Sequence, residues 1–144
     1  MPAGRLHALI IVCCFIVCCF AAPAEALGLA WKHITTSDDG LANFYMDAKS
    51  VVVRGSTRRV RLLFDYSKLQ QDPDTLIEHR SIVEVASIDC RRHALAPIEA
   101  TSYARNMGRG RAVVTMPSPQ PLRHVVAAAA SIDERVIDFV CKVR

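Results

Sequence analysis

The sequence has few aromatic residues and only one long apolar run. Aromatic side chains make up 6% of the 144 residues, with a single tryptophan. Proteins that bind single-stranded nucleic acid stack bases on aromatic rings set among basic residues, and no aromatic residues are interleaved with the arginines here. The apolar run covers residues 8–22, which is short for a membrane span. The composition therefore disfavours nucleic-acid binding and indicates no transmembrane segment in the remainder of the chain.

The sequence also lacks the spacing patterns of common catalytic and metal sites. No histidine stands in an HExxH motif or four residues from another histidine with a carboxylate partner. There is no GxSxG motif, and Gly108–Gly110 is not followed by the Lys-Ser/Thr pair of a phosphate loop. The acids of Asp38–Asp39 and Asp72–Asp74 lack the ligand spacing of a calcium loop. We therefore expect no enzyme activity, no cofactor and no metal ion. The four histidines after residue 26 are His33, His79, His93 and His124.

The first 26 residues have the three parts of a secretory signal peptide. Arg5 and His7 form a basic start, Ala8–Ala22 forms an apolar core, and Ala24–Ala26 forms an A-x-A ending. We therefore predict cleavage after Ala26 and one domain over residues 27–144. The alternative is an uncleaved N-terminal anchor.

Two of the six cysteines remain after the predicted signal peptide is removed, Cys90 and Cys141. They form an even pair in a chain that we expect in an oxidising compartment, and no CxxC motif remains. This favours a structural disulfide over a metal or redox site. The alternative is two free buried thiols.

The last stretch of the chain predicts a short helix that ends at the second of these cysteines. Ser131 and Glu134 have the spacing of a capping box, and Val136 and Val140 form an apolar i,i+4 pair. A helix this short is marginal alone. We expect it to pack on the strand over residues 81–90, whose apolar face ends in the first cysteine.

The rest of the chain shows the alternation of strands. Strands are expected over residues 31–34, 43–46, 51–54, 57–66, 81–90, 91–103 and 111–116. Gly55 supplies the turn of a hairpin between the third and fourth, residues 67–80 read as a long loop, and Pro97 predicts a bulge or an edge. Residues 117–121 read as a rigid linker. Strands followed by one helix predict an α+β fold, an antiparallel meander with the helix on one face.

Two groups of arginines stand out in a chain of net charge +4. One group lies on an expected strand, and the other surrounds the expected turn over residues 106–111. Such groups bind anionic glycans, lipopolysaccharide phosphates or acidic protein patches. The alternative is a set of solvated side chains that protects strand edges from pairing. The candidate patch for an anionic ligand comprises Arg58, Arg59, Arg61, Arg105, Arg109 and Arg111.

Several short motifs occur together in order between Trp31 and Lys142. They are Trp31, Phe44–Asp47, Ser50–Val51, Asp65–Tyr66, Arg80–Ser81, Ile88–Cys90, Tyr103, Met107–Gly110, Pro117–Pro119 and the helix closing on Cys141. With this ordered set, the chain resembles the surface-adhesin protein E family of small exported bacterial proteins.

The resemblance implies a curved antiparallel sheet with the C-terminal helix tethered to one face by a Cys90–Cys141 disulfide. It also implies a place in the periplasm or on the outer surface of a Gram-negative bacterium. For the member that gives the family its name, it implies adhesion to host matrix and serum proteins and a homodimer. Our hypothesis is a non-enzymatic exported module that binds macromolecules. The alternative is a soluble periplasmic accessory or structural protein of an envelope complex.

Overall fold

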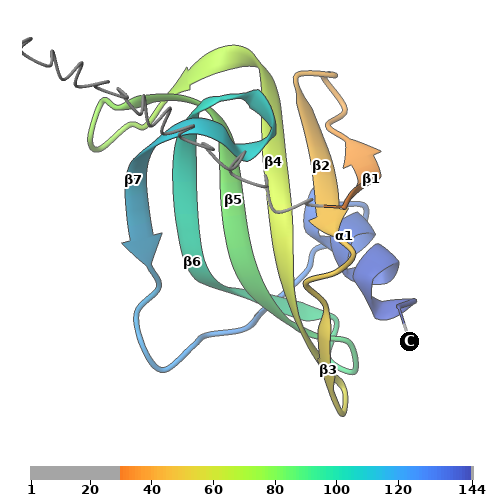
Figure 1. Cartoon of the computed structure of the whole chain (residues 1–144). Coiled ribbons are helices and arrows are strands. Elements are labelled where there is room, and N and C mark those ends of the chain that lie inside the picture. The colour runs from red at the N-terminus through yellow and green to blue at the C-terminus, as the bar shows by residue number, and fades with distance from the viewer. Residues whose placement is uncertain (1–29, 144) are drawn as a thin grey trace, which may run out of the picture.

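An eight-stranded antiparallel sheet forms the body of the protein, and a C-terminal helix lies against one side of it (Figure 1). The computed structural model describes residues 30–143, so the predicted signal peptide lies outside the described residues. The strand order is β1-β2-β4-β5-β6-β7, with β3 beside β4 and β8 beside β6. The elements are β1 (Trp31–Thr36), β2 (Ala42–Asp47), β3 (Val52–Arg54), β4 (Thr57–Gln71), β5 (Glu78–Asp89), β6 (Ala94–Arg105), the 3-10 turn η1 (Asn106–Gly108), β7 (Arg109–Pro117), β8 (Val125–Val126) and α1 (Ile132–Cys141).

The α+β meander is confirmed, and so is the register of its β3–β4 hairpin. Val53 of β3 lies opposite Arg58 of β4, as a two-residue connection requires. Gly55 in that connection has φ +58°, the left-handed conformation that glycine adopts without a steric penalty. The bulge is also where the sequence indicates it, because the β5–β6 register shifts between Val85 and Ala86, opposite Pro97.

The prediction of a long loop over residues 67–80 is wrong. β4 continues to Gln71 and β5 begins at Glu78, so only residues 72–77 connect the two strands. These strand ends extend beyond the apolar core, and most of their side chains are exposed. Backbone hydrogen bonds between the two strands hold them in place. Because these side chains are not buried, the sequence shows no alternation of apolar and polar residues there. The strand β8 was missed for a related reason, since it is a two-residue pairing with Ala94 and Leu95.

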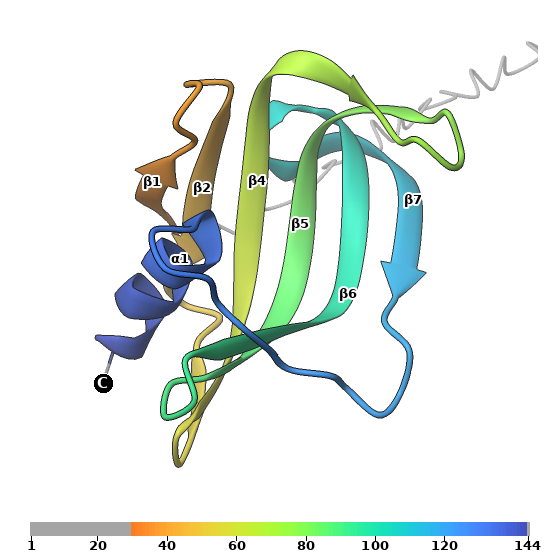
Figure 2. The ribbon, with the colours of Figure 1, turned by 180° about the vertical axis from the view of Figure 1, so that it is seen from behind.

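The core lies between the sheet and α1, on the side that we call the helix face (Figure 2). Burial of these apolar side chains supplies the main favourable free energy of folding. The fully or nearly fully buried members are Met46, Val60, Leu62, Ala86 and Ile88 from the sheet and Val136, Ile137 and Val140 from the helix.

A disulfide joins the end of this helix to the sheet. Cys90, just after β5, and Cys141 are bonded with a Cα–Cα distance of 5.7 Å, within the usual range for a disulfide. The pairing predicted from the cysteine count and implied by the family resemblance is present, and the two free thiols of the alternative are not.

The start of the helix departs in one detail from the predicted capping box. The Glu134 amide donates to Ser131 Oγ at 3.1 Å, as expected. The Glu134 carboxylate, however, accepts from the backbone N–H of Ala130 at 2.6 Å instead of that of Ser131. Ala130 has φ +61°, and the Ser131 N–H donates instead to the Ala128 carbonyl at 3.2 Å.

The opposite side of the sheet, which faces the viewer in Figure 1, is called the front face here. The turn η1 folds over its upper end. Asp65 Oδ1 accepts from the Met107 N–H at 2.6 Å and from the Asn106 side chain at 3.1 Å. Ser81 Oγ donates to the Arg105 carbonyl at 2.6 Å and accepts from the Gly108 N–H at 3.0 Å. Asn106 Nδ2 also donates to the Tyr66 carbonyl at 2.7 Å. Five hydrogen bonds therefore hold this turn against β4 and β5.

Candidate functional site

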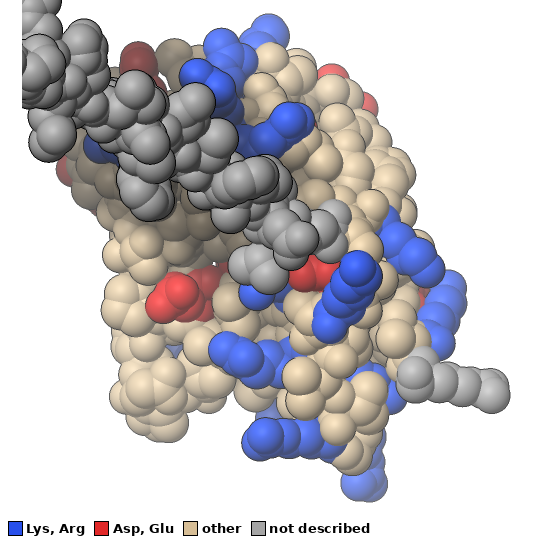
Figure 3. Space-filling model, in the orientation of Figure 1, with Lys and Arg blue, Asp and Glu red and all other residues tan. Residues whose placement is uncertain are grey.

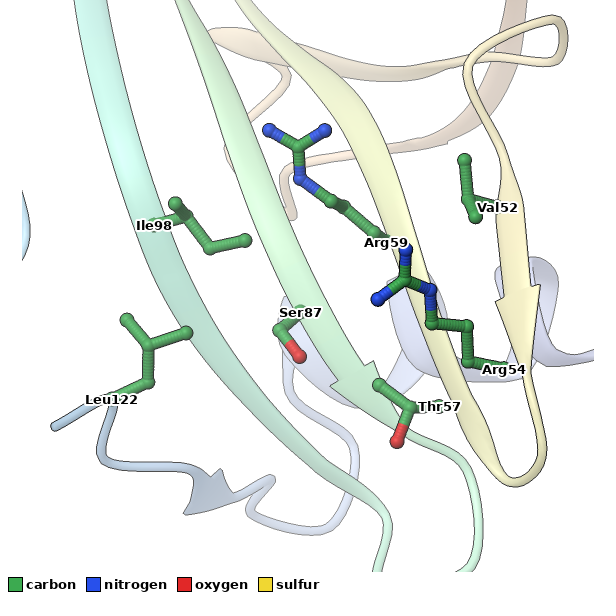
Figure 4. A pocket seen from close by; sticks show the side chains of 7 residues that line it. All are labelled: Val52, Arg54, Thr57, Arg59, Ser87, Ile98 and Leu122. Atoms are coloured by element: carbon green, nitrogen blue, oxygen red, sulfur yellow. The ribbon is translucent and has the colours of Figure 1, made fainter.

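A hollow of about 420 Å³ lies at the lower end of the front face (Figure 4). Arg54 and Arg59 lie on one side of it and Ile98 and Leu122 on the other, as Figure 4 shows. The two arginines come from the β3–β4 hairpin, whereas Ile98 belongs to β6 and Leu122 to the segment that leads to β8. Among the described residues, its lining is Val52, Arg54, Thr57, Arg59, Ser87, Ile98 and Leu122.

The register of the strands explains why these side chains share a face. Val52 lies opposite Arg59, and Arg59 lies opposite Ser87 across β4 and β5. Residues directly opposite each other in an antiparallel pair project from the same side of the sheet. Ser87 is also hydrogen-bonded to His124 Nε2 at 3.0 Å, which fixes the segment carrying Leu122 against the sheet.

The hollow combines apolar walls with positive charge. Arg54 and Arg59 are both exposed, and among the described residues no carboxylate oxygen lies within 4.0 Å of either guanidinium. Val52 remains 45% exposed. An anionic group beside an apolar group matches this arrangement, because unpaired guanidiniums attract anions and the apolar walls favour contacts that exclude water.

A second hollow, of about 310 Å³, lies on the same face near Arg61. Arg61 is 3.8 Å from the carboxylate of Asp47, and Asp47 is nearly fully buried. The charge of Arg61 is therefore partly balanced, which distinguishes it from Arg54 and Arg59. The lining of this second hollow is Arg61, Val83, Val85, Glu99, Thr101, Tyr103 and Gly108.

The six arginines singled out in the sequence are not one patch. Arg61 lies opposite Val85, whereas Tyr103, near the second group, lies opposite Ser81. Arg105 is two residues beyond Tyr103, so the groups are separated by roughly 20 Å along the strands. Figure 3 shows basic side chains gathered at the upper and lower ends of the front view. Arg111 lines a separate hollow with Leu69, Leu76 and Val113 among others.

Arg58 lies on the opposite face of the sheet from Arg59 and Arg61. It lies opposite Ile88, which is buried in the core beneath the helix, so Arg58 projects from the helix face. Its Nη1 donates to the Gly55 carbonyl at 2.9 Å. The second arginine at the hollow, beside Arg59, is therefore Arg54 and not Arg58. The register of the β3–β4 hairpin places Arg54 close to Arg59.

Glu84 is the one strongly perturbed acid among the described residues. It lies opposite Leu62 on the helix face. Burial, and to a smaller degree the charge of Asp133, raises the pKa of Glu84 from 4.5 to about 7. The sequence shows this residue only as a break in an apolar alternation. It lies on the side of the sheet away from the hollow.

The histidines are dispersed. His33 contacts Tyr45, His79 contacts Tyr66, and His93 lies 3.2 Å from Asp138. Over residues 30–143 no group of three His, Cys, Asp or Glu side chains is placed to hold a metal ion. In the same part of the chain, no helix has the length and apolar character needed to cross a membrane.

Comparison with known proteins gives a family and a fold. Residues 31–142 match the family described as Surface-adhesin protein E. The structure is similar to that of protein E from non-typeable Haemophilus influenzae, with a TM-score of 0.53 and 15% identity over 76% of this chain and 74% of that one. A second crystal form of Haemophilus influenzae protein E gives a TM-score of 0.56 and 14% identity over 76% and 86% of the two chains. At this identity the likeness shows the fold. Among curated proteins, no match is found.

Proposed function

Since this chain belongs to the surface-adhesin protein E family, we propose that it is a non-enzymatic exported protein of a Gram-negative cell envelope that binds a macromolecule at the cell surface. The observation that carries the proposal is the family match, which spans nearly the whole described chain, from residue 31 to 142. Families preserve folds more faithfully than ligands. The binding surface is therefore argued from this chain's own residues.

The hollow on the front face supports the binding role. Its two guanidiniums have no carboxylate partner among the described residues, and its far wall is formed by Ile98 and Leu122. An acidic segment of a host matrix or serum protein, with an apolar side chain next to its carboxylate, would use both features. An anionic glycan would use only the guanidiniums.

The test is binding of the full chain to immobilised matrix and serum proteins, and to heparin as a sulfated glycan. We expect Arg54→Gln combined with Arg59→Gln to weaken binding at least tenfold, since each lost charge-assisted hydrogen bond contributes about 1.5–3 kcal/mol. The matched control is Arg91→Gln combined with Arg92→Gln. It removes the same charge from exposed residues of the β5–β6 turn and should leave binding within twofold.

Two outcomes would contradict the proposal. If no protein or glycan binds saturably, the adhesive role is wrong. If both double variants weaken binding equally, the protein is attracted by net charge alone and the hollow is not the binding surface. If the protein binds heparin in preference to the matrix and serum proteins, the hollow remains the binding surface but the partner is a sulfated glycan.

We also propose that the chain forms a homodimer, as the family resemblance implies. β7 supports this, because it ends the strand order of the sheet and its residues are mostly exposed. An edge strand carries N–H and C=O groups that can pair with a second chain. Sedimentation equilibrium should give twice the chain mass, and a mass that stays at one chain at all concentrations would contradict this.

A further inference from the structure

Three arginines meet at the upper end of the sheet, on three neighbouring strands. Arg105 of β6 and Arg109 of β7 are directly opposite each other in the register. Arg80 of β5 precedes Ser81, which pairs with Tyr103 two residues before Arg105. These arginines line one hollow of about 320 Å³, together with Ala104 and Asn106.

No negative charge balances this cluster within residues 30–143. No carboxylate oxygen lies within 4.0 Å of the guanidiniums of Arg80, Arg105 and Arg109. Like charges directly opposite each other in an antiparallel pair destabilise the sheet. An anion bound between them would remove that repulsion, so the cluster favours a ligand of negative charge.

The cluster is built on a rigid part of the fold. Arg105 and Arg109 flank η1, and four hydrogen bonds from Asp65 and Ser81 hold that turn against β4 and β5. The stem of Arg105 lies against Gly110, where a Cβ atom would be only 3.0 Å from Arg105 Cγ. The stem of Arg105 is therefore packed against β7, while the residue as a whole stays exposed to a ligand.

We propose that Arg80, Arg105 and Arg109 bind a phosphate or sulfate monoester carried on a sugar. The guanidinium group presents N–H donors in a planar fork that matches two oxygens of such a group, and three guanidiniums can contact all of its free oxygens. The hollow also has room for part of the attached sugar. This site is roughly 25 Å along the sheet from the hollow of Arg54 and Arg59, and it does not depend on the proposed adhesive role.

The test is a titration of the disulfide-bonded full chain followed by amide NMR. The probes are glucose 6-phosphate and glucose 6-sulfate, with unmodified glucose as the uncharged control. We expect saturable shifts of the amides of residues 105–110 with the charged sugars and none with glucose. Arg105→Gln and, separately, Arg109→Gln should each weaken binding about tenfold or more. Arg92→Gln, which removes one exposed charge from the β5–β6 turn, should change it less than twofold.

The relative affinities for the two charged sugars identify the kind of molecule that carries the ligand group. Tighter binding of the phosphate identifies a phosphorylated glycan or glycolipid headgroup, and tighter binding of the sulfate identifies a sulfated glycan. Shifts that grow linearly without saturation, or an equal loss of binding in Arg92→Gln, would overturn the proposal. The spectrum of each variant should match that of the parent outside residues 80 and 104–111. Such a match shows that the variant is folded and that its weaker binding comes from the changed side chain.

Discussion

Gly108 shows how a single residue positions the upper part of the front face. It has φ +65°, and a Cβ atom at this position would be 2.9 Å from Cγ2 of Val83. Both the backbone conformation and the close contact therefore require glycine. The turn that carries Arg105 and Arg109 approaches β5 this closely because of that residue.

We predict that Gly108→Ala lowers the free energy of unfolding by about 2–3 kcal/mol, since it combines a left-handed alanine with a steric clash. Gly55→Ala is the matched control. Gly55 also has a positive φ, +58°, but nothing lies within 4 Å of its Cβ position, so that change should cost only about 1–2 kcal/mol. Urea unfolding of both variants measures the difference, and equal losses would show that the contact with Val83 does not restrain the turn.

A second prediction at this scale concerns Glu84, whose pKa is raised to about 7 in the folded protein. The unfolded chain ionises this carboxyl near pH 4.5, so between pH 4.5 and 7 the folded state holds more protons and stability falls as pH rises. Glu84→Gln should remove this dependence. At pH 8 it should stabilise the fold by on the order of 1–2 kcal/mol, less than the full shift implies because water still reaches part of the side chain.

The measurement is the unfolding free energy of both proteins at pH 4, 6 and 8. The control is Glu99→Gln, which removes an exposed carboxyl from the front face. A parent and a Glu84→Gln variant with parallel pH profiles would show that Glu84 titrates normally in the folded state.

At the scale of elements, α1 is held by both a covalent bond and a cap. Ten residues make a helix that is marginal by itself, and its stability depends on Val136, Ile137 and Val140 packing on the sheet. The Cys90–Cys141 bond tethers the last residue of the helix across a separation of 51 residues.

We predict that Cys141→Ser destabilises the protein by about 2–5 kcal/mol, the usual loss when a small secreted domain loses its disulfide. The parent in excess reductant should melt close to the variant, because both lack the cross-link. Thermal melting with and without reductant provides the measurement. A variant that melts with the oxidised parent would show that packing alone holds the helix.

Loss of the helix N-cap should lower the stability less than loss of the disulfide does. Ser131→Ala removes the acceptor for the Glu134 N–H and should cost about 1 kcal/mol, as at other helix N-caps. Ser118→Ala, in the segment between β7 and β8, is a control whose side chain makes no hydrogen bond among the described residues. If Ser131→Ala is no less stable than this control, the hydrogen bond from the Glu134 N–H does not stabilise the helix.

How far the sequence predicts an element depends on whether apolar burial shapes it. The helix, the β3–β4 hairpin and the bulge beside Pro97 follow from periodicity, capping and turn chemistry, and all three are present. The ends of β4 and β5 and the whole of β8 are held by backbone pairing with partners elsewhere in the chain. Such pairing leaves no local signal.

The same distinction applies to the sites of the whole molecule. Arg54 and Arg59 come together through a local hairpin register that the sequence contains. Ile98, from β6, and Leu122, from the segment between β7 and β8, lie at the same hollow through tertiary structure that no local pattern in the sequence indicates. Arg80 joins Arg105 and Arg109 because three separate strands align. Joining the two groups of arginines into one candidate patch therefore combined residues that lie far apart along the sheet.

Adhesion requires display on the outer surface of the cell, and labelling of intact cells measures this display. Lys32, Lys49 and Lys68 are exposed in the fold, so an amine reagent that cannot cross the outer membrane should label a displayed protein. The comparison is with lysed cells, with a periplasmic protein as the control for leakage. We predict labelling of intact cells at a level close to that of lysed cells. Labelling that appears only after lysis, together with the periplasmic control, would contradict surface adhesion and identify a periplasmic accessory protein instead.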